Sequence, residues 1–166
     1  MKELAAKYEI RTCTVYSGKE IVGEIIYDDN KHIAATMFVN GRSFKIEPVS
    51  DSDKNIIIRE ESNTILKFDF DYLWGGATLL SDNEETGYEI KGKFLKPGTR
   101  LVDEDNNDLV VVTTLETLPP SAQFKIIVHS DEINDFLIVS TLYYHNYASA
   151  GKLLSVLFAN SVGGAL

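Results

Sequence analysis

The stretch that decides the fold reads Phe136-Leu137-Ile138-Val139-Ser140-Thr141-Leu142-Tyr143-Tyr144. It lies in a longer segment, residues 131–150, that contains no glycine or proline. Ser130 is a suitable N-cap, and Asp131 and Glu132 would follow it at the positive end of the helix dipole. Gly151 suits the position after the last turn. We therefore predict a helix over residues 131–150, with a strand as the alternative because of its β-branched content.

This predicted helix is apolar nearly all round, and such a helix is buried on every side. Most of the remaining chain consists of short alternating apolar runs separated by turn residues, which is typical of strands. In a β-rich domain, the inside of a barrel is the place that buries a helix completely, and closing the sheet also removes its exposed edges. We predict a mainly β fold, a single closed or nearly closed antiparallel barrel of roughly 10–12 strands around the helix. The predicted strands lie near 7–16, 20–27, 32–39, 42–48, 54–60, 63–70, 86–95, 99–103, 108–115 and 122–129.

The chain also resembles itself. Shifted by 80 residues, positions 8–51 align with 88–131 without a gap, and twelve of the 44 positions are identical. Chance would give about three. Tyr8-Glu9-Ile10 matches Tyr88-Glu89-Ile90, and Phe44-Lys45-Ile46 matches Phe124-Lys125-Ile126. We predict one domain over residues 1–166, with an internal pseudo-two-fold repeat.

Composition limits the function classes. The net charge of −9 makes nucleic acid an unexpected partner, because phosphate neutralisation needs clustered lysine and arginine. The single cysteine, Cys13, rules out an internal disulfide or a cysteine-based zinc site and favours a reducing compartment. The N-terminus lacks the apolar core of a signal peptide. We expect a cytoplasmic protein, or one peripheral to a membrane, without a cofactor or metal.

The C-terminal region leaves alternatives open. His145, Asn146 and Lys152 interrupt the apolar sequence, and no segment reaches the ~20 apolar, charge-free residues that a membrane span needs. We therefore expect no transmembrane helix. Residues 152–158 are expected to add a helical turn or two packed on the barrel, with an exposed tail that binds a partner as the alternative.

The second half of the chain carries a family resemblance. It runs Tyr88-Glu89-Ile90-Lys91-Gly92-Lys93-Phe94, then Leu101-Val102-Asp103-Glu104-Asp105-Asn106 and Phe124-Lys125-Ile126-Ile127-Val128, before Asp131 and the apolar helix. This order resembles the bacterial branch of the tubby C-terminal-like, or LURP-one-related, superfamily. The resemblance implies a roughly 12-stranded barrel threaded by the helix. Tubby proteins bind phosphoinositide head groups through basic residues, so it also implies a lipid or anion ligand.

One basic cluster could serve that role. Lys91 and Lys93 project from the same face of one predicted strand, with Lys96 and Arg100 nearby. We predict these four residues as the ligand-binding site of a non-catalytic binding module that associates with an anionic lipid surface or another anion. A protein-interaction or structural domain that uses the apolar tail is one alternative, and an undetected enzyme is another. A solvated strand face is the simpler account of the same residues.

Other candidate sites favour structural explanations. The acidic run from Asp103 to Asp108 lacks the glycine and glutamate of a calcium loop, so a solvated turn is expected. Asp69 and Asp71 share one strand face, which fits a solvent-facing side. Adjacent His129, Ser130 and Asp131 do not make a catalytic triad, because triad members converge from separate positions. The remaining candidates are expected to be structural or buried: His32, His145, Cys13 and Trp74.

Overall fold

The computed structural model describes residues 1–163 apart from 30, 74, 93–97 and 119–120; the side chains of 118 and 151–163 lie outside this description. The described chain forms twelve strands and then one helix, α1 (Asp135–Gly163). The strands are β1 (Lys2–Glu9), β2 (Thr12–Ser17), β3 (Glu20–Tyr27), β4 (Ala35–Val39), β5 (Arg42–Pro48), β6 (Ile56–Glu60), β7 (Asn63–Phe70), β8 (Ala77–Ser81), β9 (Glu84–Gly92), β10 (Thr99–Val102), β11 (Asp108–Leu118) and β12 (Ser121–Val128).

These strands close into an antiparallel barrel in which each strand pairs with its neighbours in the sequence. The closing seam joins β1 to β12, with Lys2 opposite Val128 and Tyr8 opposite Ala122. Alternate residues face inward, as the period of a strand requires. On β5, for example, Phe44 and Ile46 are buried while Lys45 between them is exposed. The predicted closed barrel is confirmed.

The strand boundaries correct the prediction at two places. The predicted strand 7–16 is two strands, because Ile10 and Arg11 form a tight turn with φ values of 45° and 64°. Neither residue is glycine or asparagine, so the turn carried no composition signal. Strand β8 was not predicted. By contrast, Asn40-Gly41, a residue pair that strongly favours two-residue hairpin turns, joins β4 to β5 with φ values of 51° and 73°.

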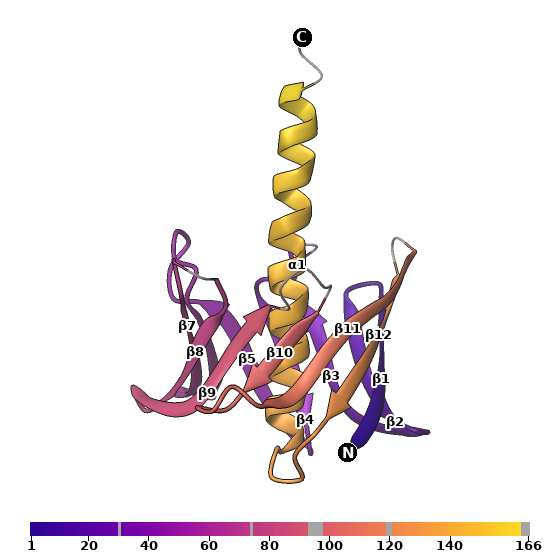
Figure 1. Ribbon diagram of the computed structural model, residues 1–166, viewed down its shortest axis with the longest axis vertical. Helices are drawn as coiled ribbons and strands as arrows, with labels where there is room; N and C mark the ends of the chain where they lie inside the picture. Colours follow the sequence, from indigo (N-terminus) through magenta and orange to yellow (C-terminus); the bar gives the residue numbers. More distant parts are fainter. Residues whose placement is uncertain (30, 74, 93–97, 119–120, 164–166) are drawn as a thin grey trace.

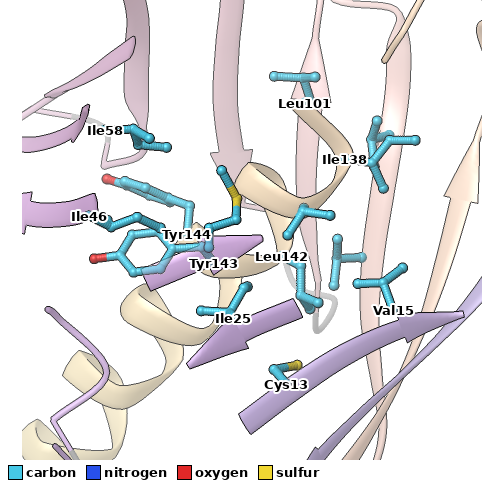
Figure 2. Close-up of a cluster of buried hydrophobic side chains, with 14 of the residues drawn as sticks. Cys13, Val15, Ile25, Ile46, Ile58, Leu101, Ile138, Leu142, Tyr143 and Tyr144 are labelled. Atoms are coloured by element: carbon cyan, nitrogen blue, oxygen red, sulfur yellow. The ribbon is translucent and has the colours of Figure 1, made fainter. Parts of the chain in front are cut away.

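Helix α1 runs through the middle of the barrel (Figure 1). Nine consecutive residues, from Ile138 to Asn146, are buried, so every side of the helix faces the wall. Figure 2 shows Ile138, Leu142, Tyr143 and Tyr144 of the helix among inward-facing side chains of the strands. The prediction of a buried apolar helix is confirmed for this part of α1.

One strand approaches the helix too closely for any side chain. At Gly23 in β3, an added Cβ would lie 2.8 Å from Val139 Cγ2 of α1 and 3.0 Å from the carbonyl oxygen of Phe38. Real Cβ atoms almost never come so close to a neighbour. Glycine at this position therefore allows the backbone of β3 to pack directly against the Val139 side chain of α1.

The helix ends differ from the prediction. Ser130 is not the N-cap: its hydroxyl accepts a hydrogen bond from the Glu132 amide, 3.3 Å away, in a turn before the helix. Asn134 caps α1 instead, because its Oδ1 accepts the Leu137 amide at 2.9 Å. At the other end α1 continues beyond Gly151 to Gly163, and its C-terminal turns extend beyond the strands (Figure 1). The predicted packing of side chains 152–158 lies outside the described residues.

The structure does not show the predicted two-fold repeat, which stays a prediction from the sequence. The aligned pair Tyr8 and Tyr88 lies on β1 and β9, eight strands apart, whereas Phe44 and Phe124 lie on β5 and β12, seven strands apart. A rotation about the barrel axis cannot satisfy both pairs. Ile10, exposed in a turn, also aligns with Ile90, which is buried.

Candidate functional site

The two ends of the barrel are distinct surfaces. Because neighbouring strands are antiparallel, successive connections alternate between the ends. Helix α1 enters at the end formed by the connections 18–19, 40–41, 61–62, 82–83, 103–107 and 129–134, called here the entry end. It leaves at the end whose connections are 10–11, 28–34, 49–55, 71–76, 93–98 and 119–120, called here the exit end.

Five consecutive residues of α1, from Tyr143 to Tyr147, bind the wall just before the helix leaves; this segment is called here the polar collar. Asn146 Nδ2 donates to the Tyr27 hydroxyl at 2.9 Å. The two ring nitrogens of His145 lie 2.8 Å from the hydroxyls of Thr99 and Thr114. The tyrosine hydroxyls donate to backbone carbonyls of three exit-end connections, namely Tyr143 to Ile33 (2.5 Å), Tyr144 to Gly76 (3.2 Å) and Tyr147 to Lys54 (3.4 Å).

The collar fixes the position of α1 in all directions. Its partners lie on β3, β10 and β11 and in the three connections named above, so they surround the helix. Buried polar groups are costly unless they are hydrogen-bonded, and here each collar side chain has a partner in the wall. The aromatic rings add further contacts, with Tyr144 4.9 Å from Phe68 and Tyr143 stacked on Tyr27 at 6.3 Å. The collar therefore ties α1 to three of the exit-end connections.

Exposed apolar side chains gather at the exit end. Leu73 is 86% exposed, Ile10 82% and Tyr72 71%, and all three lie in exit-end connections. Val49, in the connection 49–55, and Leu115, near the exit end of β11, are also exposed. The entry-end connections contain one large apolar residue, Ile133, and it is buried; the exposed apolar residues at this end, Met1, Ile21 and Phe38, lie before or within strands. An exposed apolar group of this kind indicates an interaction surface.

The acidic residues are concentrated at the entry end, opposite to the exposed apolar residues. By sequence, the entry-end connections hold seven acidic residues and one basic residue: Glu61, Asp82, Asp103, Glu104, Asp105, Asp131 and Glu132, with Lys19. Among the described residues, the exit-end connections hold five acidic and three basic residues: Asp28, Asp29, Asp51, Asp53 and Asp71, with Arg11, Lys31 and Lys54. The described part of the exit end is thus less acidic than the entry end in a chain of net charge −9.

The exit-end acids shape their own loops. Side-chain oxygens of Asp29, Asp53 and Asp71 each accept the backbone amide two residues later, at 2.8–2.9 Å. Asp28 pairs with Lys45 at 2.9 Å. These carboxylates act as turn-forming residues, the usual role of aspartate in tight loops.

The predicted basic cluster is partly placed. Lys91 on β9 and Arg100 on β10 are directly paired across the strands, and both donate hydrogen bonds of 3.3 Å to Asn106 of the entry-end connection 103–107. Each also has acidic neighbours: Lys91 Nζ lies 2.9 Å from Glu89 Oε2, and Arg100 forms an ion pair with Asp108. Lys93 and Lys96 lie outside the described residues. The structure therefore brings two of the four predicted residues together, with their charges largely balanced.

Beside this pair lies a surface hollow of about 320 Å³. Lys91 and Glu89 line one side, and Asp71 and Gly75 of the neighbouring connection line the other. Gly76 holds this connection close to β9, because a Cβ at its φ of 85° would lie 2.1 Å from the Ile90 carbonyl oxygen. The hollow thus opens on the outer wall at the edge of the exit end.

The other sequence candidates are structural where they are described. Asp103 forms a turn, since its two oxygens accept the backbone and side-chain amides of Asn107 at 2.8 and 3.0 Å; these bonds lower its pKa. Burial raises the pKa of the Cys13 thiol to about 12. His32 packs against Tyr8 and Tyr27, and burial lowers its pKa.

The remaining candidates give no chemical centre either. Asp69 pairs with Lys67 at 3.3 Å. The described residues contain no group of three or more potential metal-ligating side chains, and none of their helices is long and apolar enough to span a membrane. Trp74 lies outside the described residues.

No protein-family model, curated protein or solved structure matches this chain. The tubby-like resemblance therefore stays a prediction. The function has to be argued from the geometry of the barrel itself.

Sequence reasoning missed the apolar residues of the exit end. The sequence places Ile10 in a predicted strand and Tyr72 on the core-facing side of the strand that carries Asp69 and Asp71, whereas Leu73 falls in a predicted loop. The signal in the sequence is that successive connections alternate between apolar ones and acidic ones. This alternation can be recognised only when every strand has been identified.

Proposed function

We propose that the protein is a non-catalytic module that docks on an anionic membrane surface through the exit end of its barrel. The observation that carries this proposal is the contrast between the ends. The exit end presents exposed apolar side chains, and its described connections hold five acidic and three basic residues, whereas the entry-end connections hold seven acidic residues and one basic residue. An anionic surface would repel the entry end and so orient the protein with the exit end toward the lipid.

The energetics fit reversible binding. Burying an exposed isoleucine or leucine is worth about 1.5–3 kcal/mol, and Ile10, Tyr72 and Leu73 are available for insertion. Arg11, Lys31 and Lys54 near an anionic bilayer would add about 1 kcal/mol each, and the acidic residues of the same connections would oppose this gain. Insertion of the apolar side chains therefore supplies the main part of the binding energy, which suits reversible peripheral association.

The test is co-sedimentation of the full chain with phosphatidylserine-containing vesicles. Replacing Ile10 and Leu73 with asparagine should lower binding by about tenfold or more, because one buried apolar side chain is worth at least that factor. Asparagine tolerates the positive φ of residue 10, so folding should be preserved. Ile21→Asn is the matched control, since Ile21 is 61% exposed at the entry-end start of β3.

The wild type should bind phosphatidylserine vesicles more tightly than phosphatidylcholine vesicles. The proposal is wrong if the wild type binds neither, or if Ile21→Asn weakens binding as much as the exit-end double variant does. Light scattering of the same samples tests the alternative of protein–protein association. A monomer without vesicles supports membrane docking, whereas a dimer that the exit-end substitutions dissociate favours the alternative.

A further inference from the structure

The outer wall carries a second hollow, which shares one lining residue, Val49, with the exposed apolar group of the exit end. It has a volume of about 570 Å³, within the range typical of small-molecule sites. It extends over β6, β7 and β8. The lining residues are Val49, Ile57, Arg59, Ser62, Asn63, Thr64, Ile65, Lys67, Leu80, Asp82 and Asn83.

The floor of this hollow is unusually apolar for an outer wall. Ile56 and Ile58 belong to the core, so Ile57 between them points outward, yet it is only 7% exposed. Register places Ile57 opposite Lys67, and Lys67 opposite Leu80. Ile65 lies two residues before Lys67 on the same face of β7. Together these side chains form an apolar strip flanked by polar groups.

One hydrogen-bond donor at the hollow lacks an acceptor. Arg59 Nε is buried and makes no hydrogen bond, although the Arg59 side chain as a whole is 42% exposed, and Glu47 Oε1 lies 3.6 Å from this nitrogen. A buried donor without an acceptor costs about 1–3 kcal/mol. Lys67, the second cation of the lining, lies 3.3 Å from Asp69. Glu47 and Asp69 therefore offset the two cations, and Asp82 adds a carboxylate to the lining, so the hollow suits a singly charged anion better than a dianion.

We propose that this hollow binds a small amphipathic carboxylate, with the carboxylate on Arg59 and a short aliphatic chain along Ile57, Ile65 and Leu80. The carboxylate would supply the acceptor that Arg59 Nε lacks. The chain would cover the apolar strip. Apart from Val49, this site consists of residues outside the exit-end apolar group, so it goes beyond the proposed function and does not depend on it.

The test is titration of the full chain with octanoate, followed by amide chemical shifts in NMR spectra. Saturable shifts are expected at Ile57, Ile65 and Leu80, with a Kd of about 1 mM or tighter. Acetate, which lacks the chain, and octyltrimethylammonium, which reverses the charge, should bind at least about tenfold more weakly. The proposal is overturned if octanoate gives no saturable shifts at these residues, or if octyltrimethylammonium binds equally well.

Variants separate the two halves of the site. Arg59→Gln and Leu80→Asn should each weaken octanoate binding about tenfold, the first through the charge and the second through the floor. Lys125→Gln is the matched control, because Lys125 lies on β12 and does not line the hollow. Equal loss in Lys125→Gln would show a general charge effect and would refute the site. Arg59→Gln should bind vesicles as the wild type does, which keeps this result independent of membrane docking.

Discussion

Replacing Gly23 with alanine tests the central packing relation of the fold, the contact of the wall with α1. The new Cβ would lie 2.8 Å from Val139 Cγ2 and 3.0 Å from the Phe38 carbonyl oxygen. Overpacking of this kind costs about 1–3 kcal/mol. Alanine also restricts the unfolded chain, which returns about 0.4–1 kcal/mol. We therefore expect a net loss of about 1–2 kcal/mol in the free energy of unfolding.

The assay is urea denaturation. With a slope of about 2 kcal/mol per M, the midpoint for Gly23→Ala should fall by roughly 0.5–1 M. Gly92→Ala is the control, because Gly92 also lies in a strand but a Cβ there would have no neighbour within 4 Å. Its midpoint should stay the same or rise. Adding Val139→Ala should cost less in the Gly23→Ala background than in the wild type, because it removes the clashing methyl group.

Only part of the clash can be relieved in this way, since the Phe38 carbonyl belongs to the backbone of β4. The double variant should therefore remain less stable than Val139→Ala alone. The reasoning would be refuted if Gly23→Ala proved as stable as Gly92→Ala, because the helix would then not lie against β3 as described.

Three further predictions concern groups around the helix. Asn146→Leu should lower the free energy of unfolding by about 1–3 kcal/mol, measured in urea, because the buried Tyr27 hydroxyl loses its partner; an unchanged midpoint would contradict this. Cys13 should react with a thiol reagent only as fast as the protein unfolds, since the thiol is buried and its pKa is raised to about 12; rapid labelling of the native protein would count against the burial. In NMR titrations His32 should titrate below pH 6.5, because burial lowers its pKa. The unfolded state then binds more protons between the two pKa values, so stability should fall as the pH drops through that window; a midpoint at or above 6.5 would exclude this contribution.

The barrel was predictable from the sequence because one segment determines it. A helix that is apolar on all sides, as from Ile138 to Tyr144, has to be buried on all sides. The rest of the chain consists of strands with alternating apolar residues, so a barrel of strands has to enclose it. The strands β3, β5 and β7 were predicted to the residue, since glycine, asparagine or acidic residues mark their ends. The hydrogen-bonded role of His145 was expected only in general terms, because its threonine partners lie 46 and 31 residues away in the sequence.

The candidate surface could not be predicted, for a physical reason. Which end of a barrel a connection occupies depends on how many strands precede it. The turn at Ile10-Arg11 and the short strand β8 were both missed, and each miss reverses the assignment of connections on one side of it. The N-cap failed for a different reason: Ser130 and Asn134 both suit a helix start, and the burial of Ile133 between them requires a turn before the helix begins.

The seam between β1 and β12 has a consequence for biosynthesis. Lys2 in β1 can pair with Val128 in β12 only after almost the whole barrel has been synthesised. The helix that fills the lumen is translated after every strand. On the ribosome, the nascent chain therefore has an incomplete barrel wall, and the apolar inner surface of that wall is exposed. Contacts this distant in sequence form slowly, and exposed strand edges invite aggregation meanwhile. Folding of this protein should be completed only after translation has passed the collar, with chaperones shielding the open half-barrel until then.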